Sequence, residues 1–511
     1  MINLNCISKT RLQILIFTLL TVINAFTFKY NAIAIAIGAL ELLVVIYNLL
    51  VRKFEKAFLL IIYFLSTVIE NAYFATGIRS DDYRIYSFHT LPIVRTYHIL
   101  ALIGIIYVMT ALRQKNNPIN KMSKRLIFLW IGMFFVTLFS LAINNNSIRE
   151  IWGLTRLVIV DGYNAFLTVG LFVICLRLIN NNADFSKELH TTIISILKGV
   201  VIAAVIILFL GGKRRTESGD IYLICPLMLY WSPALILFYK SEKKINYIVY
   251  ALLSVIIQIK YTVGIPGAWW LSTGIILISF VASIIRDITF LRKNKFAFVF
   301  TLLLAIFAVA GLFIILSSYK SGGSSSYIIY KLSTAISIFS LTSDPMMWLR
   351  GLGLSVGMRV EEIANIFIEY YKSPLYLFTG KGFGGTVLHY WGVFWWGTFG
   401  VFSDVQNAAQ VYSVFHTGAA EMIINFGIVG IVFVAKWIKN VILAIFGKKH
   451  NPWLLIGSLY LLLFYSYYWS MAVCIVIFAY GVLSKENEKN EVLKNTKPSY
   501  ISVVDVVSRK E

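Results

Sequence analysis

The chain has 511 residues, of which 59% are hydrophobic and only 14% are charged, and its formal net charge is +22. This composition excludes a soluble globular domain, and the lack of short alternating segments excludes a β-barrel. So high a charge would suggest nucleic-acid binding in a soluble protein. Here we attribute it to Lys and Arg in the cytoplasmic loops of a membrane protein.

Apolar runs of roughly the 20 residues that a helix needs to cross the hydrocarbon core recur along the chain. Because the backbone must satisfy its own hydrogen bonds in lipid, we predict an all-α polytopic membrane protein with about fourteen transmembrane helices. The first run lacks a small-residue cleavage site and Lys29 follows it, which favours an uncleaved helix over a signal peptide. The predicted spans are 12–28, 32–51, 57–77, 93–112, 126–143, 154–178, 191–211, 221–239, 246–259, 267–285, 297–317, 418–435, 453–466 and 469–484.

These spans divide the chain into four parts. A transmembrane bundle covers 1–317, a long polar loop covers 318–417, further transmembrane helices cover 418–484, and a disordered cytoplasmic tail covers 485–511. If the N-terminus is cytoplasmic, the basic loops share one side, and the positive-inside rule then places the long loop outside. Those basic loops are Arg52–Lys56, Arg113–Arg125, Lys240–Lys244, Arg286–Lys295 and Lys436–Lys449.

Ionisable residues inside a span can mark a functional pathway. Asp161 and Lys198 could pair between neighbouring spans, and we favour structural pairing over a catalytic role for all such residues. The cysteines lie in the N-terminal segment or in apolar runs, so we predict no disulfide in the long loop and no zinc site. The residues concerned are Glu41, Glu70, Asp161 and Lys198 among the charges, and Cys6, Cys175, Cys225 and Cys474 among the cysteines.

The long loop begins with a flexible Gly/Ser segment at 321–326 and continues into a predicted amphipathic helix. The apolar residues of this helix recur at helical spacing, so we expect it to lie on the membrane or on the bundle. It should end before Pro374, since the residue ahead of a proline disfavours helix. The aromatic run at 389–396 suits the membrane interface. The apolar residues are Val360, Ile363, Ala364, Phe367 and Tyr371, with Glu361, Glu362 and Glu369 among them.

Arg359 heads this helix. A guanidinium is always charged, and its planar fork of donors suits phosphate oxygens. The simpler interpretation is a surface arginine that pairs with Glu362 one helical turn later, and position alone favours it.

A glycine-rich turn follows at Gly380, Gly382, Gly384 and Gly385. It is not a phosphate-binding P-loop, because it lacks the G-x-x-x-x-G-K-[ST] pattern and a preceding strand. The glycines more plausibly allow a tight turn, or a close approach to a ligand or a neighbouring helix.

His416 stands just before a predicted transmembrane helix. A neutral imidazole can take a proton from an acceptor hydroxyl near neutral pH, and a helix N-terminus nearby also favours an anion. The alternative is an interfacial or capping histidine, which would be preferred if Arg359 and the glycine turn did not share the loop.

The motifs in this part of the chain follow a fixed order that resembles one family. The order is Arg359, a helix, Pro374-Leu375, Gly380-x-Gly382-x-Gly384, His416 and then a helix with Gly427-x-x-Gly430. It resembles the C-terminal signature of the bacterial O-antigen polymerase and O-antigen ligase superfamily. The resemblance covers roughly residues 350–435, and the upstream body agrees in character without identifiable motifs.

The resemblance implies a GT-C-like, metal-independent and cofactor-free glycosyltransferase of the bacterial inner membrane, with its active site facing the periplasm. Its donor would be a glycan on undecaprenyl diphosphate. A polymerase extends a new lipid-linked repeat unit at its non-reducing end, and a ligase transfers the chain to lipid A-core. His416 matches the catalytic histidine, and Arg359 matches an arginine that holds the diphosphate. Expected partners are the bilayer, a chain-length regulator and a flippase, but no nucleic acid.

The chain departs from the family at a second arginine, which usually stands at the outer end of an earlier helix. Lys260 occupies that place here, and lysine lacks the bidentate fork. The cluster Lys213-Arg214-Arg215 is a rival, although attraction to lipid headgroups explains it equally well.

Three functions therefore compete. A lipid-linked glycan transferase leads, with polymerase ahead of ligase. A transporter or flippase for lipid-linked sugars would need buried charge along a path through the bundle but no long outer loop. A structural assembly partner would tolerate the loss of His416.

Overall fold

The computed structural model describes residues 9–27, 31–69, 118–143, 148–215, 221–261, 266–287, 353–392, 411–412, 417–447, 451–464 and 473–496. This part of the chain is almost entirely helical, as predicted. The predicted spans 93–112 and 297–317 and the Gly/Ser segment lie outside the described residues.

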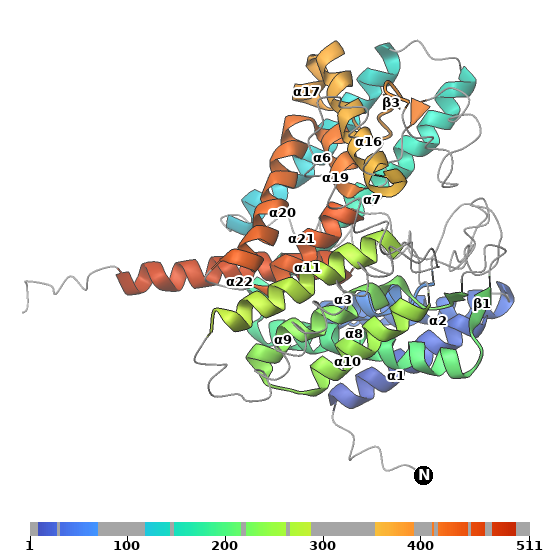
Figure 1. The fold of residues 1–511 in the computed structure, drawn as a ribbon, viewed down its shortest axis with the longest axis vertical. Coiled ribbons are helices and arrows are strands. Elements are labelled where there is room, and N and C mark those ends of the chain that lie inside the picture. Colours follow the sequence, from blue (N-terminus) through green and yellow to red (C-terminus); the bar gives the residue numbers. More distant parts are fainter. Residues whose placement is uncertain are drawn as a thin grey trace, which may run out of the picture.

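The helices form two groups, shown in Figure 1 as a lower and an upper half. The lower group comprises α1 (Lys9–Thr27), α2 (Asn31–Leu50), α3 (Phe54–Ser66), α8 (Ala183–Phe209), the 3-10 helix η3 (Leu227–Ala234), α9 (Leu235–Glu242), α10 (Asn246–Lys260) and α11 (Pro266–Ile285). The upper group comprises α6 (Pro118–Ile143), α7 (Ile148–Asn181), α16 (Gly353–Lys372), α17 (Leu375–Thr379), α19 (Gly418–Phe426) and α20 (Ile428–Phe446).

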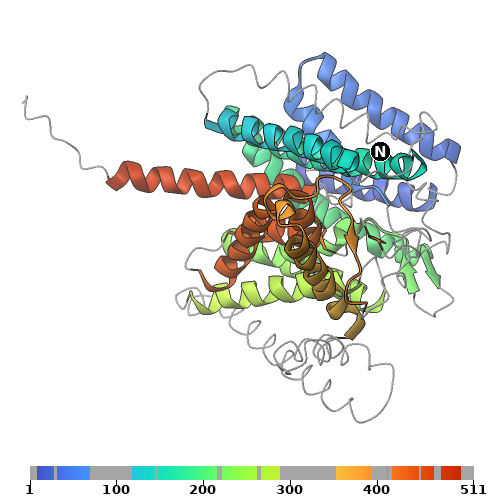
Figure 2. The same cartoon turned by 90° about the horizontal axis from the view of Figure 1, so that it is seen from above.

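Two further helices and two small sheets complete the described fold. The helix α21 (Pro452–Leu463) packs between the groups, and α22 (Val473–Thr496) projects away from them in Figure 2. The strands β1 (Lys213–Arg215) and β2 (Ile221–Leu223) pair antiparallel. So do β3 (Val387–Leu388) and β4 (Val411–Tyr412), which lie in the upper half.

Within the described part of the chain, three helices are long and apolar enough to cross a membrane: Lys9–Thr27, Asp184–Phe209 and Ile428–Phe446. The packing of α1 against α8 explains which face of α1 is buried. Gly199 of α8 lets Phe17 of α1 approach so closely that a Cβ at Gly199 would lie 2.7 Å from the ring. The opposite face of α1 leaves Leu15 and Leu19 exposed. An apolar outer surface on such helices fits a hydrocarbon environment, so the protein is membrane-associated.

Contacts at the helix ends agree with the predicted topology. Lys9 pairs with Glu188 at 2.5 Å, and Lys240 pairs with Asp287 at 3.1 Å. The guanidinium of Arg286 donates to the carbonyls of Ala444 and Ile445, at the end of α20. The positive-inside rule assigns all these residues to one side.

At the opposite ends of the helices, Asn24 donates to the hydroxyl of Thr67 at 3.0 Å. The hydroxyl of Thr137 accepts from the backbone N–H of Phe383 at 2.7 Å. The positive-inside rule assigns these residues to the outer half. Each pair therefore joins residues that the rule places on the same side.

The structure corrects two predicted helices. The span 418–435 is not one helix, because Gly427 has φ +56° and α20 folds back on α19 there. The fold-back is tight: a Cβ at Gly430 would lie 2.0 Å from the carbonyl of Met422. At the other end, α22 continues to Thr496, into the tail that we expected to be disordered.

Among the predicted in-span charges, Lys198 is buried with its Nζ 4.1 Å from the ring centre of Tyr247. The side chain of Asp161 lies outside the described part, so its predicted pairing with Lys198 stays a prediction, and Glu70 lies outside the described part altogether. The described cysteines Cys175, Cys225 and Cys474 are free and buried.

Candidate functional site

The predicted helix of the long loop is α16, and it ends at Lys372, before Pro374, as predicted. Its buried face mixes charged, polar and apolar residues. Glu361, Glu362, Asn365 and Ile366 are each 0% exposed and Tyr370 is 4% exposed, whereas Phe367 is 45% exposed and Tyr371 is 87% exposed. Of the predicted apolar residues, Ile363 packs against the buried core, but Phe367 and Tyr371 do not pack on the described bundle.

The glycine turn is a docking joint between α17 and the α19–α20 hairpin. Gly380 has φ +71°, and a Cβ there would lie 2.1 Å from the carbonyl oxygen of Asn425. The backbone N–H of Lys381 donates to the carbonyl of Ile424 at 2.8 Å. Gly382 has φ +75° and sits so close to Thr137 of α6 that a side chain would not fit. These glycines serve close approach to neighbouring helices.

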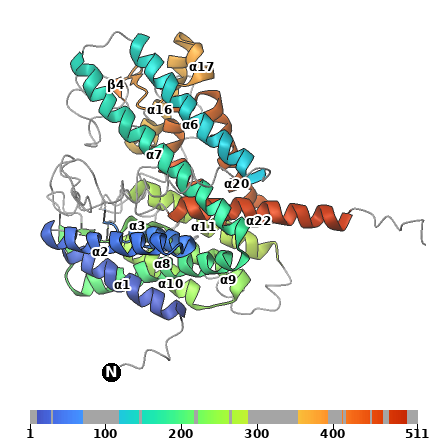
Figure 3. The same ribbon diagram turned by 180° about the vertical axis from the view of Figure 1, so that it is seen from behind.

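Phe383 anchors the same turn. Its ring is 1% exposed and lies against Trp130 of α6 and Phe426 of α19. Gly162 of α7 provides the space: a Cβ there would lie 3.1 Å from the Phe383 ring. The turn is therefore held by α6, α7 and α19 together, and Figure 3 shows α6 and α7 beside α16 from behind.

A polar clasp holds residues 381–391 onto α16. The ammonium of Lys381 donates to Glu369 and, at 2.7 Å, to the carbonyl of Thr386. The hydroxyl of Tyr390 also donates to Glu369, and the Nζ of Lys372 lies 3.8 Å from the Tyr390 ring centre. Burial lowers the pKa of Lys381 although Glu369 opposes the shift. Burial and the Glu369 carboxylate both raise the pKa of Tyr390.

A second part of the clasp contains a histidine that we did not single out from the sequence. The Nε2 of His389 lies 3.1 Å from Glu361, with the two side chains 2% and 0% exposed. The Oδ1 of Asn365 accepts from the backbone N–H groups of Tyr390 and Trp391 at 3.1 and 3.3 Å. The sequence signal for this polar helix face was the four-residue spacing of Glu361, Asn365 and Glu369, which places them on one side of α16.

Both neighbours of the His416 segment are described, although His416 itself lies outside the described residues. Before it, Tyr412 of β4 pairs with Val387 of β3, so the clasp also fixes this strand. After it, the hydroxyl of Thr417 caps α19 by accepting from Ala420 at 3.3 Å. The helix α19 packs on α16, where Tyr370 donates to the carbonyl of Ile423 at 2.6 Å.

Arg359 lies half-buried on α16. The structure therefore brings together the helix of Arg359, the glycine turn and the helix that directly follows His416.

The candidates for a second diphosphate contact lie elsewhere. Lys213 is exposed on β1, which also contains Arg214 and Arg215. Lys260 is exposed at the end of α10, with its Nζ 5.7 Å from the ring centre of Tyr261. Figure 1 shows β1 and α10 in the lower half, whereas α16 lies in the upper half.

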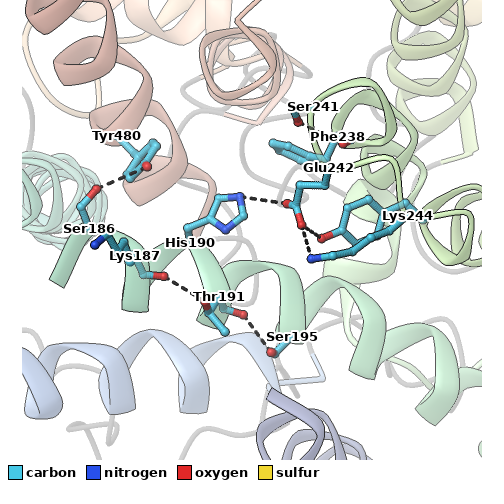
Figure 4. A network of polar contacts seen from close by, with 11 residues as sticks. Ser186, Lys187, His190, Thr191, Ser195, Phe238, Ser241, Glu242, Lys244 and Tyr480 are labelled. Carbon is cyan, nitrogen blue, oxygen red and sulfur yellow. Dashed lines mark hydrogen bonds and ion pairs between the residues drawn. The ribbon is translucent and has the colours of Figure 1, made fainter. Parts of the chain in front are cut away.

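A second polar network joins α8, α9, α10 and α22 at the ends that carry the basic loops (Figure 4). His190 lies 3.3 Å from Glu242, which also accepts from Lys244 and from the hydroxyl of Tyr247, each at 2.5 Å. Ser186 bonds Tyr480 of α22 at 3.3 Å. Burial raises the pKa of Glu242, but its bonds with Lys244 and Tyr247 and the nearby charges outweigh burial, so the net pKa is lowered.

Comparison of the chain with protein-family models, with curated proteins and with solved structures found no match. The motif order in residues 350–435 and the geometry around α16 and α19 are therefore the grounds for assigning a function.

Proposed function

We propose that the protein is a polymerase for O-antigen or a related surface polysaccharide. It transfers a glycan from undecaprenyl diphosphate onto the non-reducing end of a lipid-linked repeat unit. In this proposal the chain has about fourteen transmembrane helices in a GT-C-like arrangement. It resides in the bacterial inner membrane with residues 318–417 facing the periplasm.

In the proposed reaction, a hydroxyl of the acceptor sugar attacks the anomeric carbon of the donor. His416 takes the hydroxyl proton. The bond between the anomeric carbon and the diphosphate oxygen breaks, and undecaprenyl diphosphate leaves with the electron pair. Arg359 stabilises the negative charge on the leaving diphosphate, since fixed cations act strongly where charge develops in a site shielded from water.

The observation that carries the proposal is the packing of three motif segments that are far apart in sequence. The glycine turn bonds the end of α19 through Lys381 and Gly382, and α19 packs on α16, the helix of Arg359. The chain leading to His416 is tied to the same unit by the β3–β4 pairing. Such a unit is what a transfer site needs, because reacting groups must be held in fixed positions.

Polymer formation in cells tests the proposal. We expect His416→Ala and Arg359→Ala to abolish the polymer while the protein still accumulates in the membrane. Arg359→Lys, which keeps the charge but loses the bidentate fork, should leave only a small residue of activity. Normal polymer length and amount in both alanine variants would remove the enzyme assignment at these residues.

One observation favours a second candidate, a transporter for lipid-linked sugars. Lys198 is buried inside a candidate span, 6% exposed, and its ammonium faces the ring of Tyr247, whose hydroxyl bonds Glu242. Charged residues inside spans often lie on a transport path. If this candidate is correct, Lys198→Met should stop movement of the lipid-linked sugar across the membrane, whereas His416→Ala should not.

A further inference from the structure

The outer face of α16 and α17 carries an apolar stripe that no other described element covers. Only Ser373 and Pro374 separate the two helices. Phe367 and Tyr371 lie four positions apart on α16, and Leu375 and Phe378 lie three positions apart on α17, so each pair shares a face of its own helix. The apolar stripe consists of Phe367, Tyr371, Leu375 and Phe378, which are 45%, 87%, 60% and 65% exposed.

The burial pattern of this unit differs from that of a water-soluble helix. Its buried face combines Ile366 and Tyr370 with the polar residues Glu361, Glu362 and Asn365, while its exposed face carries large apolar side chains. A soluble helix places charge outward and apolar residues inward. Buried carboxylates together with an exposed apolar face fit surroundings of low polarity, which is the condition in lipid.

The apolar stripe is continuous with the outer surface of a candidate membrane span. The helix α17 packs against α20 near Gly427, where a Cβ would lie 2.5 Å from the carbonyl of Leu377. The first turns of α20 expose Ile428 and Val432, 44% and 47%. Figure 1 shows α17 beside the upper end of α20. Lipid that surrounds this end of α20 would therefore also meet α17.

One cation, Lys372, lies at the edge of the apolar stripe, where it could meet lipid headgroups. Lys372 is exposed next to Tyr371 and lies over the ring of Tyr390. Aromatic rings and lysines are typical of the membrane–water boundary, where the rings sit at headgroup level and lysines reach toward phosphate. The arrangement is apolar on one side and cationic at its edge.

We propose that the apolar stripe inserts into the lipid bilayer and that α16 and α17 lie at its outer boundary instead of in water. The occupant of the surface is the acyl-chain region of the membrane, with Lys372 at the headgroups. This inference chooses the membrane over the bundle for the apolar residues Phe367 and Tyr371. It does not depend on the proposed glycosyl transfer.

Nitroxide labels on the full-length protein in vesicles of phosphatidylethanolamine and phosphatidylglycerol test the proposal. The labelled positions are Tyr371→Cys and Phe378→Cys. Val432→Cys on α20 provides the lipid reference, and Lys187→Cys on α8, whose side chain is 83% exposed, provides the water reference. The signal of the unsubstituted chain is subtracted in each case, which accounts for its own cysteines.

Collision rates with oxygen and with a water-soluble nickel chelate are then compared. We expect the oxygen-to-nickel ratio at Tyr371 and Phe378 to match that of Val432 and to exceed that of Lys187 severalfold. A ratio equal to that of Lys187 at both positions would overturn the proposal. Dipolar broadening that disappears on dilution with unlabelled protein would also overturn it, because the occupant would then be a second copy of the chain.

Discussion

The buried ammonium of Lys381 bonds the carboxylate of Glu369 and the backbone carbonyl of Thr386. Its side chain is 11% exposed and that of Glu369 is 12% exposed. Removing one partner of a buried pair leaves the other charge without compensation, which is more costly than losing the attraction itself. The clasp should therefore depend strongly on this residue.

We predict that Lys381→Met lowers the free energy of unfolding by on the order of 3 kcal/mol. Unfolding in detergent by denaturant measures the change, and hydrogen exchange should increase first at residues 381–391. Lys372→Met is the control, because Lys372 is exposed and its contact with the Tyr390 ring is worth about 1 kcal/mol or less. Equal losses in the two variants would contradict the role given to Lys381.

Glu242 gives a prediction for pH. Its pKa is lowered in the folded state from 4.5, so its stabilising contribution is present above that pH and is lost as the pH falls through the lower folded value. We expect the melting temperature of Glu242→Gln to be lower than that of the wild type at pH 7. The difference between the two melting temperatures should shrink as the pH drops below 4.5. A difference that is constant over this range would show that the carboxylate charge is not the cause.

At the residue scale, the sequence predicted where α16 ends but not which face it buries. The proline at 374 is a local signal, and it was sufficient for the end. The burial of Glu361 depends on a partner from residues 381–391, His389, which is not visible in the helical periodicity of α16. His389 was missed for the same reason, since its partner Glu361 is on another element.

At the scale of elements, two glycines near the contact between α17 and α19 can be compared. Gly380 and Gly392 both have positive φ, +71° and +60°. A Cβ at Gly380 would lie 2.1 Å from the Asn425 carbonyl, whereas a Cβ at Gly392 meets nothing within 4 Å. Both alanine variants strain the backbone, but only one also collides with a neighbouring helix.

We predict that Gly392→Ala costs roughly 1 kcal/mol of backbone strain, and that Gly380→Ala costs a further 1–3 kcal/mol or so for the forced shift of α19. Thermal unfolding of the two purified variants in detergent gives the comparison. If Gly380→Ala is no worse than Gly392→Ala, the turn does not dock on α19 as described.

The break between α19 and α20 could not be predicted from hydropathy. Residues 418–435 are mostly apolar, interrupted only by Glu421 and Asn425, and glycines such as Gly427 and Gly430 occur inside membrane helices without ending them. Here Gly427 takes a left-handed φ, and Gly430 allows the returning helix to touch Met422. Only tertiary contacts distinguish a hairpin from a span.

For the whole molecule, the predicted topology places Lys213 outside the cell and Lys244 inside it. We expect Lys213→Cys to react with a membrane-impermeant maleimide in intact cells, and Lys244→Cys to react only after lysis. Both residues are exposed, so both should react in the lysed control. Reaction of Lys244→Cys from outside, with Lys213→Cys protected, would reverse the orientation and put α16 on the cytoplasmic side.

The central claim is that the unit of α16, the glycine turn and α19 transfers a glycan between lipid carriers. The most direct test is reconstitution of the purified chain with labelled lipid-linked oligosaccharide, followed by product sizing. The account predicts longer lipid-linked products with the wild type and none with His416→Ala or Arg359→Ala. If the label only changes its side of the membrane and keeps its length, the protein is a transporter and the claim is contradicted.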